Sequence, residues 1–220
     1  MQRLFSAFCL LILAAFFSPL IAQQNPDTAF QRVIQERAAK VVAPLAIKNV
    51  AKSARVTKVV AQQYLQLSAI QEERDAAVKA AKASGGTKQG IDSQLKVITT
   101  AAEVRVNKLH KQYLANLSAD LTTSQIETIK NGMTYNVLPN TYAAYQDMLP
   151  DLTKEQKAQI LTWLTEAREY AMDAESSKAK HAWFGKYKGR INNYLSAAGI
   201  DMKKAGEEWQ ARIKARNNSK

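Results

Sequence analysis

Apolar residues recur every three or four positions over most of this chain, which is the period of an α-helix. A first helix is predicted from Pro26 to a break at Pro44, because proline cannot continue a helix interior. A second, longer helix over 45–83 ends at the Ser-Gly-Gly sequence of 84–86, and the helical pattern resumes over 91–117. Because a short glycine-containing turn joins these two long helices, we expect them to pack as an antiparallel hairpin.

The sequence Leu-Thr-x-x-Gln occurs twice after the hairpin, at 121–125 and at 152–156. A threonine followed three residues later by glutamine is a capping box, so Thr122 and Thr153 each predict the start of a helix. The same pattern resembles the repeated motif of the small periplasmic helical chaperones of the Spy type. A chaperone or envelope-stress role is therefore the alternative function that the sequence leaves open.

The segment between these two copies, 131–142, loses the helical period and is predicted to be an irregular connection. Gly132 is a residue that can end the preceding helix. Tyr135 and Tyr142 lie in this segment, and loops carry function more often than helices do. We therefore treat it as a second candidate binding surface.

Two further helices are predicted at about 154–174 and 178–198, and each carries an aromatic and polar stripe beside its apolar one. If the helices pack antiparallel, the two stripes form the walls of a cleft; in the alternative, both stripes are buried. Gly185 and Gly189 lie in the middle of the second helix, which predicts close approach of another helix or of a ligand. The apolar stripes are Ile160, Leu161, Leu164, Ala167 and Ala171, and Phe184, Ile191, Leu195 and Ala198; the aromatic and polar stripes are Trp163, Glu166, Tyr170 and Asp173, and Trp183, Tyr187, Arg190 and Tyr194.

These elements predict a single all-α domain over 23–220. Its long antiparallel hairpin, about 45–118, is followed by a compact C-terminal set of helices at about 121–217.

The first residues have the pattern of a secretory signal peptide, predicted as 1–22. Arg3 precedes an apolar run over 4–21, and cleavage is expected after Ala22, which leaves Gln23 as the first residue. A membrane anchor is the alternative, but the run has no basic residue after it to stop its transfer. The prediction is a periplasmic or extracellular protein with no stable membrane insertion after cleavage. Cys9 is removed with the peptide, so the mature chain has no cysteine.

The chain is basic, with 31 Lys and Arg residues against 19 Asp and Glu and a net charge of +12. Export makes nucleic acid an improbable partner, and the basic residues form no dense arm. The simplest explanation of the charge is that the basic residues lie on a solvated helical surface. Alternatively, they bind an anionic partner, either a polysaccharide or a charged envelope surface.

Three runs in the second half of the chain carry a family resemblance. They are 148–157, 166–173 and 181–195, the last reading His-Ala-Trp-Phe-Gly-Lys-Tyr-Lys-Gly-Arg-Ile-Asn-Asn-Tyr-Leu. The chain resembles, over roughly 30–209, a family of secreted Bacteroidetes proteins defined by a domain of unknown function. The resemblance implies sugar binding and brings no catalytic residues with it.

The candidate function is therefore carbohydrate binding without catalysis. Aromatic rings serve as stacking platforms, and charged and amide groups bond to hydroxyls or carboxylates. The predicted ligand-binding residues are Trp163, Glu166, Tyr170, Asp173, His181, Trp183, Tyr187, Arg190, Asn193 and Tyr194, together with Tyr135 and Tyr142 of the irregular connection.

A glycan-processing enzyme is the weaker alternative. Glu166 and Asp173 are separated by about 10.5 Å of helix rise, which is at the outer edge of the spacing in an inverting glycosidase and too far for a retaining one. Glu169 and Asp173 are one turn apart and are expected to form ion pairs. The two histidines, His110 and His181, are on different helices without metal-ligand spacing, so neither a metal nor another cofactor is predicted.

Overall fold

The computed structural model describes residues 26–218, and these residues form eight α-helices and one short 3-10 helix, with no strand among them. The prediction of an all-α fold is confirmed. The predicted signal peptide lies outside the described residues. Within 26–218, no helix combines the length and the apolar composition needed to cross a membrane. The elements are α1 (Pro26–Val42), η1 (Ala43–Leu45), α2 (Val50–Ala83), α3 (Lys88–Ser118), α4 (Thr123–Met133), α5 (Val137–Met148), α6 (Lys154–Met172), α7 (Ser177–Ala197) and α8 (Met202–Asn218).

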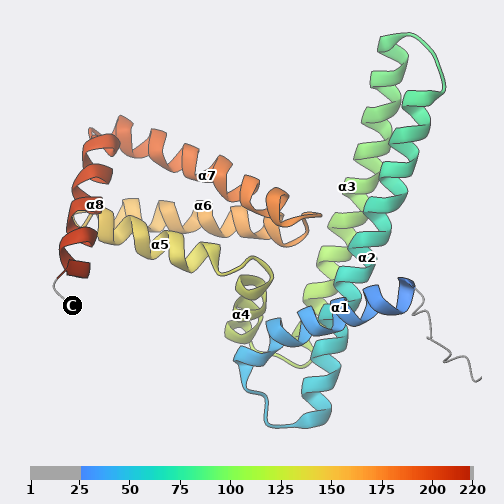
Figure 1. Cartoon of the computed structure of the whole chain (residues 1–220), viewed down its shortest axis with the longest axis horizontal. Coiled ribbons are helices and arrows are strands. Elements are labelled where there is room, and N and C mark those ends of the chain that lie inside the picture. Colours follow the sequence, from blue (N-terminus) through green and yellow to red (C-terminus); the bar gives the residue numbers. More distant parts are fainter. Residues whose placement is uncertain (1–25, 219–220) are drawn as a thin grey trace, which may run out of the picture.

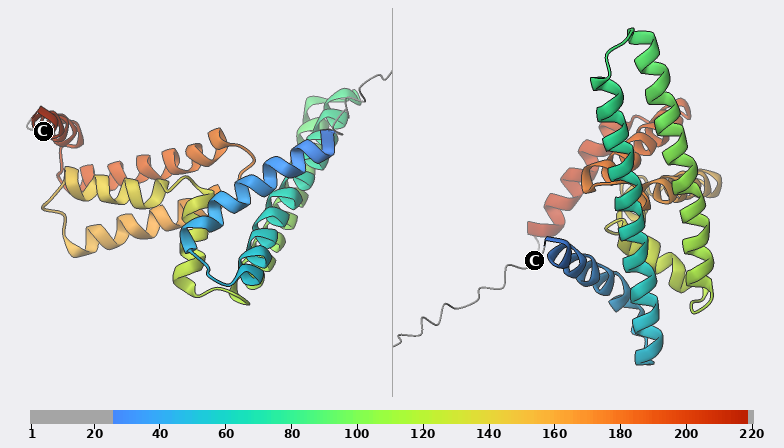
Figure 2. Two further views of the ribbon diagram at one scale, coloured as in Figure 1. Left: turned by 60° about the horizontal axis from the view of Figure 1, so that its bottom comes forward. Right: turned by 90° about the vertical axis from the view of Figure 1, so that its right-hand side faces the viewer.

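The helices form two packed units, which we call the hairpin half (α1 to α4) and the C-terminal half (α5 to α8). The antiparallel pair α2 and α3 is the longest feature of the molecule, and α1 packs across its base (Figure 1). The helices α5, α6 and α7 lie side by side, and α8 crosses the end that is farthest from the hairpin (Figure 2). Contacts between α4 and α6 join the two halves.

Each half has its own hydrophobic core. In the hairpin half, buried residues of α1 to α4 such as Ala38, Val60, Leu117 and Ile129 pack together. A Cβ atom on Gly132 would lie 3.4 Å from the Val41 side chain, at the lower limit of ordinary van der Waals contact, so α1 lies close against α4 at this point.

The upper part of the hairpin extends beyond this core. A small cluster of Leu67, Ile70 and Leu109 holds α2 against α3 above the base. Farther along α3, Val97 and Val104 are 69% and 63% exposed, so the α2–α3 contact alone supports this part of the hairpin.

The core of the C-terminal half confirms most of the predicted apolar stripes. Ile160, Leu164, Phe184, Ile191 and Leu195 are fully buried between α6 and α7. The prediction of burial was wrong for two residues of these stripes. Leu161 is 39% exposed, because it lies at the edge of the buried face of α6, and Ala198 is exposed because α7 ends one residue before it.

Both predicted capping boxes are confirmed. The Thr122 hydroxyl accepts a hydrogen bond from the backbone N–H of Gln125, whose side chain accepts one from the N–H of Thr122. The same reciprocal pair joins Thr153 and Gln156 at the start of α6. The Leu-Thr-x-x-Gln pattern therefore has a complete structural role at both places.

The predicted irregular connection over 131–142 was wrong in extent, because only 134–136 separate α4 from α5. Tyr135 and Asn136 reverse the chain in the left-handed conformation, with φ of 57° and 55°. Pro139 does not interrupt α5, because it lies in the first turn, where an N–H has no partner within the helix.

Gly185 and Gly189 do not meet another helix. A Cβ atom at either position would have no neighbour within 4 Å, so the predicted close approach of a protein element was wrong. Both residues lie on the exposed face of α7.

Candidate functional site

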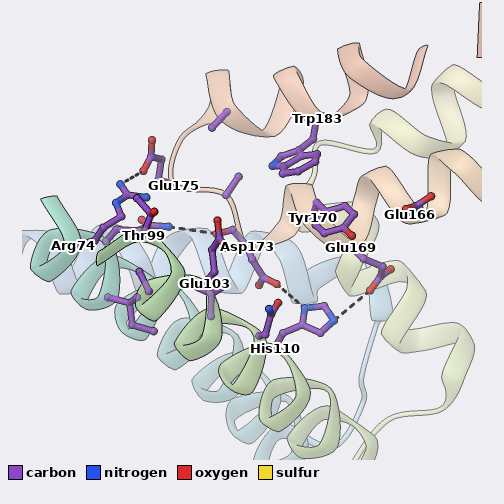
Figure 3. A pocket seen from close by; sticks show the side chains of 17 residues that line it. Arg74, Thr99, Glu103, His110, Glu166, Glu169, Tyr170, Asp173, Glu175 and Trp183 are labelled. Carbon is purple, nitrogen blue, oxygen red and sulfur yellow. Dashed lines mark hydrogen bonds and ion pairs between the residues drawn. The ribbon is translucent and has the colours of Figure 1, made fainter. Parts of the chain in front are cut away.

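A cavity of about 750 Å³ lies where the hairpin half faces the end of α6 and the start of α7. Seventeen residues line it, and they come from α2 and α3 on one side and from α6, α7 and their connection on the other (Figure 3). The two halves of the chain therefore build the site together. Neither half contains it alone.

One wall of the cavity is aromatic. The rings of Tyr170 on α6 and Trp183 on α7 stack with their centroids 4.5 Å apart and their planes 16° apart. The ammonium group of Lys186 lies over the Trp183 ring, 5.1 Å from its centroid. The ring face of this stack that stays open is therefore that of Tyr170, whose residue is 48% exposed.

The floor of the cavity is a His–carboxylate pair that joins the two halves. His110 Nδ1 on α3 lies 2.6 Å from Asp173 Oδ2 at the end of α6, and His110 Nε2 lies 3.6 Å from Glu169 Oε2 (Figure 3). The hydrogen bond to Asp173 raises the pKa of His110, and partial burial offsets some of this effect. Asp173 also accepts a hydrogen bond from the side chain of Gln63 on α2, at 3.1 Å.

Glu169 is held from behind by two cations. The Lys130 Nζ atom lies 3.0 Å from Glu169 Oε2, and the Arg168 guanidinium lies 3.0 Å from Glu169 Oε1. Arg168 is 2% exposed and also bonds to Glu127 and to the Asn131 side chain, which is 2.8 Å away. This network fixes α4 against α6 and orients the Glu169 carboxylate.

The turn between α6 and α7 is fixed by a buried lysine. Lys180 Nζ donates hydrogen bonds to the carbonyl oxygens of Ala171 and Met172, at 2.9 Å and 2.8 Å. These carbonyls belong to the last turn of α6, where that of Ala171 also accepts from the backbone N–H groups of Asp173 and Ala174. Burial lowers the pKa of the Lys180 ammonium to about 8. Since this turn carries Asp173 and leads to Trp183, Lys180 positions the floor and the aromatic wall.

The opposite wall comes from the hairpin. Arg74 on α2 lies 2.5 Å from Glu175, and Gln71 donates to the Asp173 carbonyl oxygen at 3.3 Å. Glu103 and Asn107 of α3 also line the cavity. Within residues 26–218, the side chains of these two residues form no hydrogen bond or ion pair, so they are available to a ligand.

Four of the predicted ligand-binding residues line this cavity, namely Glu166, Tyr170, Asp173 and Trp183. Other members of the two stripes contact each other directly. Trp163 and Tyr194 contact each other edge to face at 5.3 Å, and the Arg190 guanidinium lies 4.5 Å from the centroid of the Trp163 ring.

Tyr187 is 6% exposed, and burial together with the Glu166 carboxylate raises the pKa of its hydroxyl to about 12. Tyr135 and His181 stack on each other at 5.6 Å, away from the residues that line the cavity. Tyr142 packs against the core of the C-terminal half, and Asn193 is exposed on α7. A binding role for these residues stays a prediction.

Sequence reasoning missed the contribution of the hairpin: Arg74, Glu103, Asn107 and His110. His110 was noticed only as one of two histidines. Helical periodicity describes each helix by itself, so nothing in it indicates that α3 would face the end of α6.

The fold is all-α, and a ligand-sized cavity lies between its two helical units. A family model described as a protein of unknown function, DUF3826, matches residues 31–215, so the chain belongs to this family. The predicted resemblance to a family defined by a domain of unknown function is confirmed at that level. A comparison with curated proteins gives no match.

Proposed function

We propose that this protein binds a carbohydrate, without transforming it, in the cavity between the two halves. The observation that carries the proposal is the open ring face of Tyr170, backed by Trp183, in a cavity that also contains free polar groups. A sugar ring has an apolar face that stacks on an aromatic ring and a rim of hydroxyls that need hydrogen-bond partners. Glu103 and Asn107 supply such partners.

The size of the cavity supports a small ligand or the end of a longer glycan. Its volume of about 750 Å³ falls in the range of small-molecule sites.

Carboxylates dominate the lining, which favours a neutral or cationic sugar over the anionic polysaccharide suggested by the net charge. Like charges at close range in a partly buried site are unfavourable. The basic residues lie mainly elsewhere on the helices, where a solvated surface accounts for them.

Binding is favoured over catalysis because the two carboxylates on the floor are already engaged. Glu169 pairs with Lys130 and Arg168, and Asp173 with His110. A glycosidase needs one carboxylic acid with a raised pKa beside a second carboxylate. Both Leu-Thr-x-x-Gln copies form capping boxes, so helix capping accounts for this motif without a chaperone role.

The site of action that goes with this proposal is the periplasm or the cell exterior, as the signal-peptide pattern of 1–22 predicts. Exposure to environmental glycans would follow from export.

A glycan array probed with the purified exported protein tests the proposal. We expect binding to a defined set of glycans, loss of that binding in Tyr170→Ala, and retention in Tyr170→Phe, which keeps the ring. Tyr135→Ala is the matched control, because Tyr135 is 52% exposed and lies outside the cavity. No binding to any glycan, or equal loss in the Tyr135 variant, would contradict the proposal.

A further inference from the structure

We infer that the cavity selects a sugar that carries a protonated amino group, an inference that rests on the proposed carbohydrate binding. The aromatic stack and the cavity volume define the site, and the charge of its lining decides which ligand it favours. Five carboxylates line the cavity, from Glu103, Glu166, Glu169, Asp173 and Glu175, against the cationic groups of Arg74 and His110. This local excess is the reverse of the net charge of +12 of the whole chain.

Three of these carboxylates are neutralised by close partners. Glu169 contacts Lys130, Asp173 contacts His110, and Glu175 contacts Arg74, with distances of 3.0, 2.6 and 2.5 Å. They shape the cavity and leave little charge for a ligand to balance.

The other two carboxylates are not balanced in this way. Glu166 interacts with the Tyr187 hydroxyl, which is neutral, and its one ion-pair contact is with Arg190, 3.7 Å away between two exposed side chains, a pair that is worth little in water. Within residues 26–218, Glu103 on α3 has no ion-pair or hydrogen-bond partner, and it lines the wall that faces α6 and α7. A cation in the cavity would therefore find an unpaired carboxylate on the hairpin side.

The aromatic wall favours the same ligand. A ring face attracts a cation within about 6 Å of its centroid, and the open face here is that of Tyr170. The stack already shows this behaviour on its far side, where the Lys186 ammonium lies over Trp183. A sugar whose ring stacks on Tyr170 and whose ammonium reaches Glu103 would satisfy both walls of the cavity.

Three oligosaccharides with the same β-1,4 backbone separate the contributions of charge and sugar. These are oligomers of glucosamine, of N-acetylglucosamine and of glucose, and their affinities are measured by titration calorimetry at about pH 6, where a sugar amine is protonated. We expect the glucosamine oligomer to bind at least about tenfold more tightly than the other two, because only it forms a charge-assisted hydrogen bond.

Glu103→Gln should abolish this preference, reducing glucosamine binding about tenfold while leaving binding of the glucose oligomer unchanged. Asp92→Asn is the matched control: it removes the same charge from an exposed position on the same helix, outside the cavity, and should change nothing. Spermidine serves as a second probe, because it carries ammonium groups without a sugar ring.

The outcomes distinguish the inference from the function on which it rests. Equal binding of the three oligomers would overturn the amino-group selectivity and leave carbohydrate binding intact. Spermidine binding as tight as that of the glucosamine oligomer would overturn the assignment of the ligand as a sugar. Absence of binding by every glycan on the array would overturn the proposed function itself.

Discussion

The imidazole of His110 and the carboxylate of Asp173 lie 2.6 Å apart, and this contact ties α3 of the hairpin half to the end of α6 in the C-terminal half. It lies at the floor of the cavity, between the aromatic wall and the hairpin wall. The relative position of the two walls therefore depends on a titratable group.

This contact should make stability depend on pH. Because the folded-state pKa of His110 is raised above 6.5, its contribution is complete below about pH 6.5 and is lost as the pH rises through the raised value. We expect the free energy of unfolding of the parent protein to exceed that of His110→Gln at low pH, with the difference shrinking above pH 6.5. Urea unfolding of both proteins across this range measures it. Curves that stay parallel would contradict the assignment.

Arg168→Met should destabilise the fold strongly. The Arg168 guanidinium is buried and connects Glu127, Glu169 and Asn131, so its loss leaves two partly buried carboxylates to share the single charge of Lys130, at a cost of about 3 kcal/mol. Arg190→Met is the matched control, because that guanidinium is 55% exposed and its loss should cost less than about 1 kcal/mol. Denaturant midpoints compare the two, and similar costs would refute the structural role of Arg168.

The capping threonines should matter for stability and not for binding. Thr122→Ala and Thr153→Ala should each cost about 1 kcal/mol, since each removes an acceptor for a backbone N–H at a helix start. Thr162→Ala, on the exposed face inside α6, should have a smaller effect. If either cap variant kept full stability and lost the ability to prevent aggregation of a client protein, the chaperone alternative would replace the capping interpretation.

Gly185→Ala and Gly189→Ala should stabilise α7 by up to about 1 kcal/mol each. Alanine is the better helix former, and nothing lies within 4 Å of the added methyl groups. Thermal unfolding measures the gain, and glycan affinity should stay unchanged. Reduced affinity in either variant would show that a ligand approaches this face of α7, as the sequence pattern first indicated.

The parts of the fold that depend on local chemistry could be predicted from the sequence. The hairpin, the caps at Thr122 and Thr153 and the buried stripes of α6 and α7 follow from periodicity and from nearby side chains. The start of α5 was not predicted, because a proline such as Pro139 usually indicates a break in a helix. A helix accepts proline in its first turn, and Pro139 lies in the first turn only because α5 begins at Val137.

Only the α6 and α7 side of the candidate site could be predicted from local sequence patterns. Tyr170, Asp173 and Trp183 lie close in sequence on two consecutive helices, so angular position placed them together. Glu103 and His110 reach the cavity through the packing of the hairpin half against α6, a set of long-range contacts that no local pattern encodes.

The indole N–H signals in a ¹H–¹⁵N correlation spectrum test the central claim most directly. The chain has three tryptophans, and each lies in a different environment: Trp183 on the cavity, Trp163 beneath Arg190, and Trp209 bonded to Asp147 in α5. A titration with a glycan found by the array, assigned with three Trp→Phe variants, should shift the Trp183 signal most and leave that of Trp209 in place. A shift confined to Trp209, or three unchanged signals at a saturating glycan concentration, would contradict binding in the cavity between the two halves.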